Sequence, residues 1–449
     1  MLKEPWLELA SDLLAEVEQA FEQGLDLGRE GMKAEAEQIM ALPPGEEREA
    51  KALAFHQKVA VAGVRPDYAY REPSDWPGIS EVLTGDDIPR ILPIRDELAD
   101  RIRGAWFGRI CGCLLGKPFE GWRSEKYYAF LKESGQYPLS YYASFDVAPE
   151  LRQRLDLKDV KTDACIRSMS REHIQKMIED DDTNYTVLGL KLIEEKGVDF
   201  TPDDVAAFWL GHLPILHVCT AERVAYRNLV RLLTPPATAC YANPYREWIG
   251  AQIRADFFGY VNPGRPRRAA EMAWRDASIS HIKNGIYGEM YVAAALALAL
   301  TEKDLPRVLR GALAYIPPQS RLHEAVEEAF AWRGQYDFAG AYEAFHKKWN
   351  ENTPHHWCHT ISNAQIVVLA LLYGEYDFGR TICRAVDLLL DTDCNGATAG
   401  SILGALIGEK AIPAAWKEPL HDKLLTGVAG YNEVSISAMA EKTMGMIAG

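Results

Sequence analysis

The sequence of 449 residues lacks several features that would identify common classes of protein. No Cys-x-x-Cys pair occurs among the eight scattered cysteines, which argues against a zinc ribbon or a disulfide scaffold and favours buried thiols in a reducing compartment. No apolar run is long enough to span a membrane, and the first residues show no signal peptide. Basic residues are too few to balance the acidic ones, because the formal net charge is −15. We therefore expect a cytoplasmic protein that contacts neither nucleic acid nor membrane.

Alternating strand patterns are also scarce. Almost every apolar segment instead repeats at helical spacing, which predicts an all-α fold. We expect an N-terminal helical extension over residues 1–95, whose first helix covers residues 7–21, and a main domain over residues 96–449. Residues 123–175 are polar and mixed in composition, so they are predicted to form an insertion or a lid.

Glycine is concentrated on two of the predicted helices. The first set, spaced by four residues, is Gly104, Gly108, Gly112 and Gly116. The second set is Gly400, Gly404 and Gly408. A glycine inside a helix costs about 1 kcal/mol relative to alanine, so a close approach of another backbone should offset that cost. The spacing predicts tight contacts between helices at the centre of the domain.

Two short acidic segments lie some distance apart in the chain. Residues 179–183 read Glu-Asp-Asp-Asp-Thr, and residues 391–395 read Asp-Thr-Asp-Cys-Asn. Each precedes a predicted helix, so one acid in each could simply cap that helix. Adjacent aspartates repel each other, however, and carboxylate oxygens are natural ligands of Mg²⁺. The two segments together favour a shared site for two cations.

Other polar residues allow a structural or a functional interpretation. Glu120 follows the first glycine-rich helix and is either an acid in a surface turn or a residue of the site. His355, His356 and His359 are followed by Asn363, and this pattern favours hydrogen bonding to a substrate or packing in a cleft. A three-histidine metal site is less favoured, because adjacent residues point in different directions on a helix.

These motifs together resemble the ADP-ribosylglycohydrolase family, which includes the enzyme that removes ADP-ribose from dinitrogenase reductase. The resemblance runs from about residue 101 to residue 408. The segments that carry it are Arg-Gly-Ala at 103–105, Pro-Phe-Glu-Gly at 118–121, Asp-Asp-Thr at 181–183 and Asp-Thr-Asp at 391–393, which leads into Ala-Gly at 399–400.

The resemblance implies a compact all-α fold that binds two divalent cations, Mg²⁺ or Mn²⁺. It also implies hydrolysis of a glycosidic bond in an ADP-ribosylated protein or in a small ADP-ribosyl or ribosyl compound. The expected metal ligands are Asp180, Asp181, Asp182, Asp391, Asp393 and Cys394. The expected catalytic residues are Glu120, Asp182 and Asp391. The expected substrate-binding residues are His359, Asn363, Arg254 and Gly116.

The sequence departs from the family pattern at three positions. Asp180 and Cys394 stand where the family usually has Thr or Ser, and Cys113 replaces an acid. A thiol is a poor ligand for Mg²⁺ and shifts the preference towards Mn²⁺ or a softer ion. The alternative interpretation is a non-catalytic member of the fold that binds ADP-ribose or has a structural role.

Two other helical metal-dependent families fit the sequence less well. Isoprenoid synthases require Asp-Asp-x-x-Asp, and no acid has that spacing after Asp181. The HD phosphohydrolases require an aspartate after a His-Asp pair, and none follows His421-Asp422.

Overall fold

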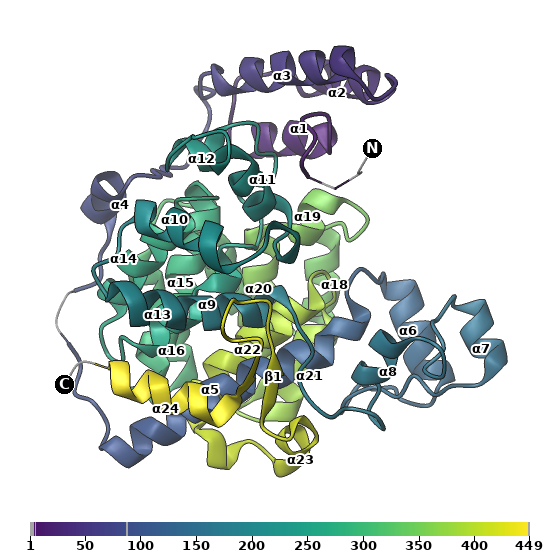
Figure 1. Ribbon diagram of the computed structural model, residues 1–449, viewed down its shortest axis with the longest axis vertical. Helices are drawn as coiled ribbons and strands as arrows, with labels where there is room; N and C mark the ends of the chain where they lie inside the picture. The colour runs from purple at the N-terminus through teal and green to yellow at the C-terminus, as the bar shows by residue number, and fades with distance from the viewer. Residues whose placement is uncertain (1–3, 5, 87–88, 448–449) are drawn as a thin grey trace.

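The computed structural model describes residues 4, 6–86 and 89–447 of the chain. These residues form 24 α-helices and one two-stranded antiparallel sheet (Figure 1). The prediction of an all-α fold is therefore confirmed. None of the helices in the described ranges has both the length and the apolar character needed to cross a bilayer.

The first four helices are α1 (Leu13–Glu22), α2 (Arg29–Met40), α3 (Glu46–Ala60) and α4 (Trp76–Val82). The next ten are α5 (Arg95–Gly116), α6 (Ser124–Glu133), α7 (Pro149–Arg154), α8 (Ala164–Met169), α9 (Asp181–Lys196), α10 (Pro202–His212), α11 (Thr220–Leu229), α12 (Ala237–Cys240), α13 (Asp256–Tyr260) and α14 (Pro266–Ala277). The remaining elements are α15 (Lys283–Ala299), α16 (Leu305–Ala312), α17 (Arg321–Gln335), α18 (Phe338–Lys348), α19 (Pro354–Cys358), α20 (Thr360–Gly374), α21 (Phe378–Asp387), α22 (Thr392–Ile407), α23 (Ala414–Lys417), β1 (Lys423–Leu425), β2 (Glu433–Ser435) and α24 (Ile436–Met446).

Helices α5 and α22 pack against each other in an antiparallel pair along their glycine faces. A Cβ atom built on Gly112 would lie 1.9 Å from the carbonyl oxygen of Gly396, and one built on Gly108 would lie 2.1 Å from that of Gly400. The same contact continues at both ends, where Gly104 faces Gly404 and Gly116 faces Thr392. The geometry matches the helix contact that the glycine spacing predicts, and it extends that spacing to Gly396.

The N-terminal helices form a small apolar core, to which Ala242 of the main body also belongs, and a polar face of α1 docks on the main body. Phe55 and Ala36 are fully buried within this small core. On the docking face, Glu16 pairs with Arg246 at 2.8 Å. The first helix of the structure is shorter than the predicted helix over residues 7–21, because α1 begins only at Leu13. Asp12 has a φ of 50°, in the left-handed region, so a right-handed helix cannot continue through it.

Residues 123–175 contain α6, α7 and α8, which extend to one side of the molecule (Figure 1). They are held by an aromatic cluster in which Phe130 stacks on Phe145, with ring centroids 5.0 Å apart, and Phe119 meets Tyr127 edge to face. This segment therefore has a packed aromatic interior, although its composition is polar. Its role as a lid, and the division of the chain at residue 95, stay predictions.

Candidate metal centre

Three helix ends bring the acidic segments together. Asp180 caps α9, because its side chain accepts a hydrogen bond from the backbone N–H of Asp182. The antiparallel pairing of α5 and α22 places the end of one helix beside the start of the other. The Thr392 hydroxyl donates to the carbonyl oxygen of Gly116 at 2.9 Å and fixes that register. Residues far apart in the chain therefore meet where α5, α9 and α22 converge.

The convergence produces three overlapping groups of potential ligand atoms. Within each group the ligand atoms lie within 4.8 Å of one another. The groups are Glu120 with Asp391 and Asp393, Asp182 with Asp393 and Cys394, and Cys113 with Asp180 and Asp182. Asp393 belongs to two groups and so does Asp182, which makes the three groups one continuous acidic centre. Asp181 belongs to none of them.

Two buried carboxylate oxygens in this centre have no hydrogen-bond partner, Asp182 Oδ2 and Asp393 Oδ1. Burial and the neighbouring carboxylates raise the pKa of both aspartates above the ordinary range, and burial with Asp393 does the same to the pKa of Asp391. An unpaired buried carboxylate oxygen is costly. A divalent cation would satisfy both oxygens, so the donor set fits an oxygen-liganded metal.

Two side-chain cations, which the sequence analysis did not assign to the site, already lie at its edges. Lys117 binds Asp180 and, although burial opposes it, holds the pKa of that carboxyl below its usual value. Arg109 is fully buried and donates at 3.2 Å to Asp182 Oδ1 and at 2.7 Å to Asp256 Oδ2. Arg109 could have been identified from the sequence, because it is a charged residue among the glycines and apolar residues of a helix predicted to lie at the centre of the domain.

The loop before α22, which ends at Asp391, contains two residues with a strained backbone. Leu389 and Leu390 have φ angles of 64° and 56°, a region that costs a residue other than glycine about 1–2 kcal/mol. The Asn363 side-chain oxygen accepts hydrogen bonds from the Asp391 backbone N–H at 3.3 Å and from the Asn395 amide at 2.8 Å. Asn363 therefore positions this acidic loop.

The other predicted substrate-binding residues are engaged within the protein. Gly116 serves the helix contact described above. Arg254 is buried in an ion cluster with Asp276 and Glu222, so a substrate could reach its guanidinium only by breaking those pairs. His359 caps α20 through its Nδ1 atom. The geometry gives no support to direct substrate contact by Gly116 or Arg254.

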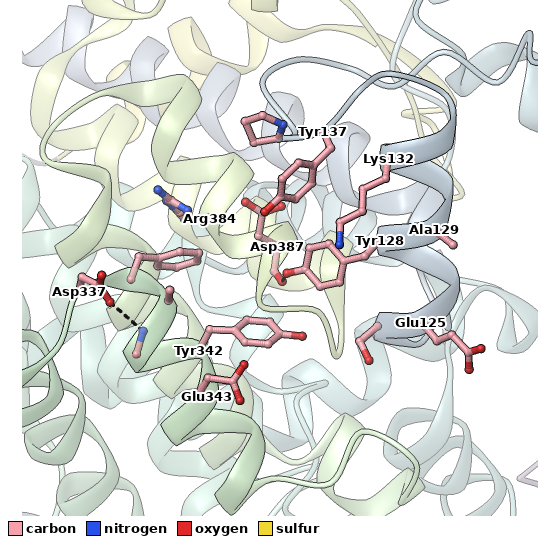
Figure 2. Close-up of a pocket in the computed structure, with 15 residues that line it drawn as sticks. Glu125, Tyr128, Ala129, Lys132, Tyr137, Asp337, Tyr342, Glu343, Arg384 and Asp387 are labelled. Atoms are coloured by element: carbon pink, nitrogen blue, oxygen red, sulfur yellow. Dashed lines mark hydrogen bonds between the residues drawn. The ribbon is translucent and has the colours of Figure 1, made fainter.

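A separate groove of about 1160 Å³ lies between α6, α18 and α21 (Figure 2). Tyr128 and Tyr342 point towards each other across it, and Asp387 and Arg384 border it from α21. None of the predicted site residues lines this groove.

The fold and the acidic centre together define a helical protein with a carboxylate-rich site where three helices meet. A model of the ADP-ribosylglycohydrolase family matches residues 94–445. The chain belongs to the ADP-ribosylglycohydrolase family, which confirms the resemblance found in the sequence.

The chain is similar to a solved structure described as an ADP-ribosylglycohydrolase-related protein complex, at 21% identity and with a TM-score of 0.48. The similarity covers 78% of this chain and 98% of that one. No curated protein matches the chain.

Proposed function

We propose that this protein is a divalent-cation-dependent glycohydrolase that cleaves the glycosidic bond of an ADP-ribosyl or ribosyl compound. Membership of the family supports the reaction class. The observation that carries the metal dependence is the pair of buried, unpartnered carboxylate oxygens on Asp182 and Asp393, within a centre built from three helix ends.

The side chains have distinct proposed roles. Asp182, Asp391 and Asp393 would hold the cations, Mg²⁺ or Mn²⁺, with Asp180 and Cys394 at the edge of the set. Bound divalent cations orient sugar hydroxyls and lower the pKa of a bound water. Glu120 is exposed beside Asp391 and Asp393, so its carboxyl can exchange a proton with a substrate or with water at the rim.

Lys117 favours a second candidate, a member of the family that binds ADP-ribose without cleaving it. Its ammonium group is bound by Asp180 and so supplies a positive charge that a second cation would otherwise bring. The number of cations bound by each chain distinguishes the two candidates. Two Mn²⁺ ions for each chain support the two-cation hydrolase, and a single ion without turnover supports the binding protein.

The test combines Mn²⁺ titration with release of ADP-ribose from ADP-ribosyl-arginine. We expect Asp182→Asn and Asp391→Asn each to lower turnover by more than about 100-fold, because removing a metal ligand costs at least as much as removing a group that orients one. The control is Asp203→Asn, at an exposed position in the first turn of α10, which should act as the unmodified protein does. Unchanged turnover in both site variants would contradict the assignment.

A further inference from the structure

Three histidines at the junction of α19 and α20 surround the carboxylate of Glu22, the last residue of α1. His355 Nε2 lies 3.3 Å from Glu22 Oε2, and His356 Nε2 lies 3.3 Å from Glu22 Oε1. His359 Nε2 lies 3.8 Å and Arg321 Nη1 4.0 Å from Glu22 Oε2. We call the three histidines and Arg321 the histidine socket.

The second ring nitrogen of each histidine determines what the socket can bind. Each Nδ1 atom accepts a hydrogen bond from a group that can only donate. The donors are the Trp248 indole to His355 at 3.1 Å, the Asn350 backbone N–H to His356 at 3.2 Å and the Ile361 backbone N–H to His359 at 3.1 Å. Each neutral ring therefore carries its proton on Nε2. A metal ligand needs a free lone pair on that atom, so these N–H groups suit an anion and not a cation.

The carboxylate of Glu22 leaves part of the socket unused. His359 Nε2 and Arg321 Nη1 are buried without a hydrogen-bond partner, although both face the same carboxylate. Burial and the neighbouring His355 lower the pKa of His359 to about 3, so this ring is a neutral donor near pH 7. The carboxylate therefore leaves two of the four converging donors unpaired at 3.8 and 4.0 Å, whereas the oxygen atoms of a tetrahedral oxyanion spread in more directions and suit donors that converge from several sides.

Glu22 can leave the socket while α1 stays in place. Its side chain keeps 22% of its exposure and lies at the end of the helix. The helix itself is held further back by the buried pair of Glu16 and Arg246. Rotation of the Glu22 side chain alone would move the carboxylate away from the three histidines.

We propose that the histidine socket binds a phosphate-type oxyanion and that Glu22 is an internal ligand that competes for it. Glu22 is tethered beside the socket, so its effective concentration is of the order of millimolar or higher. An external anion binds only as far as it outcompetes this carboxylate. The socket contains none of the carboxylates of the metal centre, so this proposal can fail or succeed independently of the proposed function.

The first experiment measures binding of inorganic phosphate by calorimetry to the full-length chain, to Glu22→Ala and to the control Glu18→Ala. Glu18 lies on the same helix but pairs with Arg29 at the surface. We expect Glu22→Ala to bind phosphate at least about tenfold more tightly, because the internal competitor is gone. The control should match the unmodified chain. Equal affinity in all three proteins would overturn the proposal.

A second variant and a spectrum make the result specific. Adding His356→Gln to Glu22→Ala should remove the gained affinity, and retention of the gain would overturn the socket as the binding site. Glu22→Gln removes the charge with little change of shape and replaces Glu22→Ala if that variant does not fold. Long-range ¹H–¹⁵N spectra should show His355, His356 and His359 protonated on Nε2, and protonation on Nδ1 would refute the donor assignment.

ADP identifies the source of the phosphoryl group. Tighter binding of ADP than of inorganic phosphate by Glu22→Ala assigns the socket to the diphosphate of a nucleotide. Equal or weaker binding of ADP assigns the socket to free phosphate.

Discussion

Replacing Gly112 with alanine tests whether the close pairing of α5 and α22 holds the domain together. The added Cβ would lie 1.9 Å from the carbonyl oxygen of Gly396 and 2.4 Å from its carbon, so backbone atoms would have to move. Overpacking of a core costs about 1–3 kcal/mol, and a rigid backbone as the obstacle puts this case at the upper end. The alanine regains about 1 kcal/mol of helix propensity. We expect a net loss of about 2 kcal/mol in the free energy of unfolding.

Urea unfolding followed by circular dichroism measures that loss, and Gly334→Ala provides the matched control. Gly334 lies inside α17, and a Cβ built there would meet nothing within 4 Å. The control should therefore gain about 0.5–1 kcal/mol. Separation of the two helices would also move Glu120 away from Asp391, so Gly112→Ala should bind Mn²⁺ more weakly than the control. Equal stability of the two variants would refute the close-packing argument.

Two further predictions concern buried charges. Arg109→Met leaves Asp182 and Asp256 without their shared cation, so unfolding in urea should show that the free energy of unfolding falls by about 3–5 kcal/mol. The control is Arg103→Met, at a partly exposed ion pair of the same helix, which should change stability by less than about 1 kcal/mol. Equal losses of stability in the two variants would contradict the argument that burial makes the Arg109 pairs costly to break. Burial raises the pKa of Asp387 from 3.8 to about 6, so the stability that the protonated carboxyl provides is lost as pH rises through that window. Asp387→Asn should therefore gain stability relative to the unmodified chain from pH 3.8 to about 6, by up to about 3 kcal/mol, and then stay level; a difference independent of pH would show that Asp387 ionises normally.

The sequence allowed the centre of the fold to be predicted because two local patterns carry it. Glycines spaced by four residues lie on one face of a helix whatever the rest of the chain does. The positions of Gly108 and Gly400 therefore indicate a contact even before the partner helix is known. The acidic segments start helices for an equally local reason, since aspartates favour helix N-termini.

The remaining features of the site depend on partners distant in the chain. Arg109 could be seen as a charge that interrupts a glycine-rich helix, but its bonds to Asp182 and Asp256 come from two other helices. His359 Nε2 lies 3.8 Å from Glu22 of α1, a partner that its spacing from Asn363 could not indicate, and its contact with substrate stays a prediction. Spacing along one helix contains no information on either partner.

Helix α1, which lies outside the family match, supplies Glu22, whereas the three histidines lie within residues 94–445. Cys358, which directly precedes His359 in the chain, places its Sγ atom 3.8 Å from Asp391 Oδ2, so the histidine socket lies close to the candidate metal centre. Deletion of the N-terminal helices would therefore remove Glu22 from a socket that lies close to the loop carrying Asp391. It would also strip the buried Arg246 of its partner Glu16, which costs several kcal/mol by itself. Point substitution of Glu22, which leaves that pair intact, is the perturbation that separates anion competition from loss of the fold.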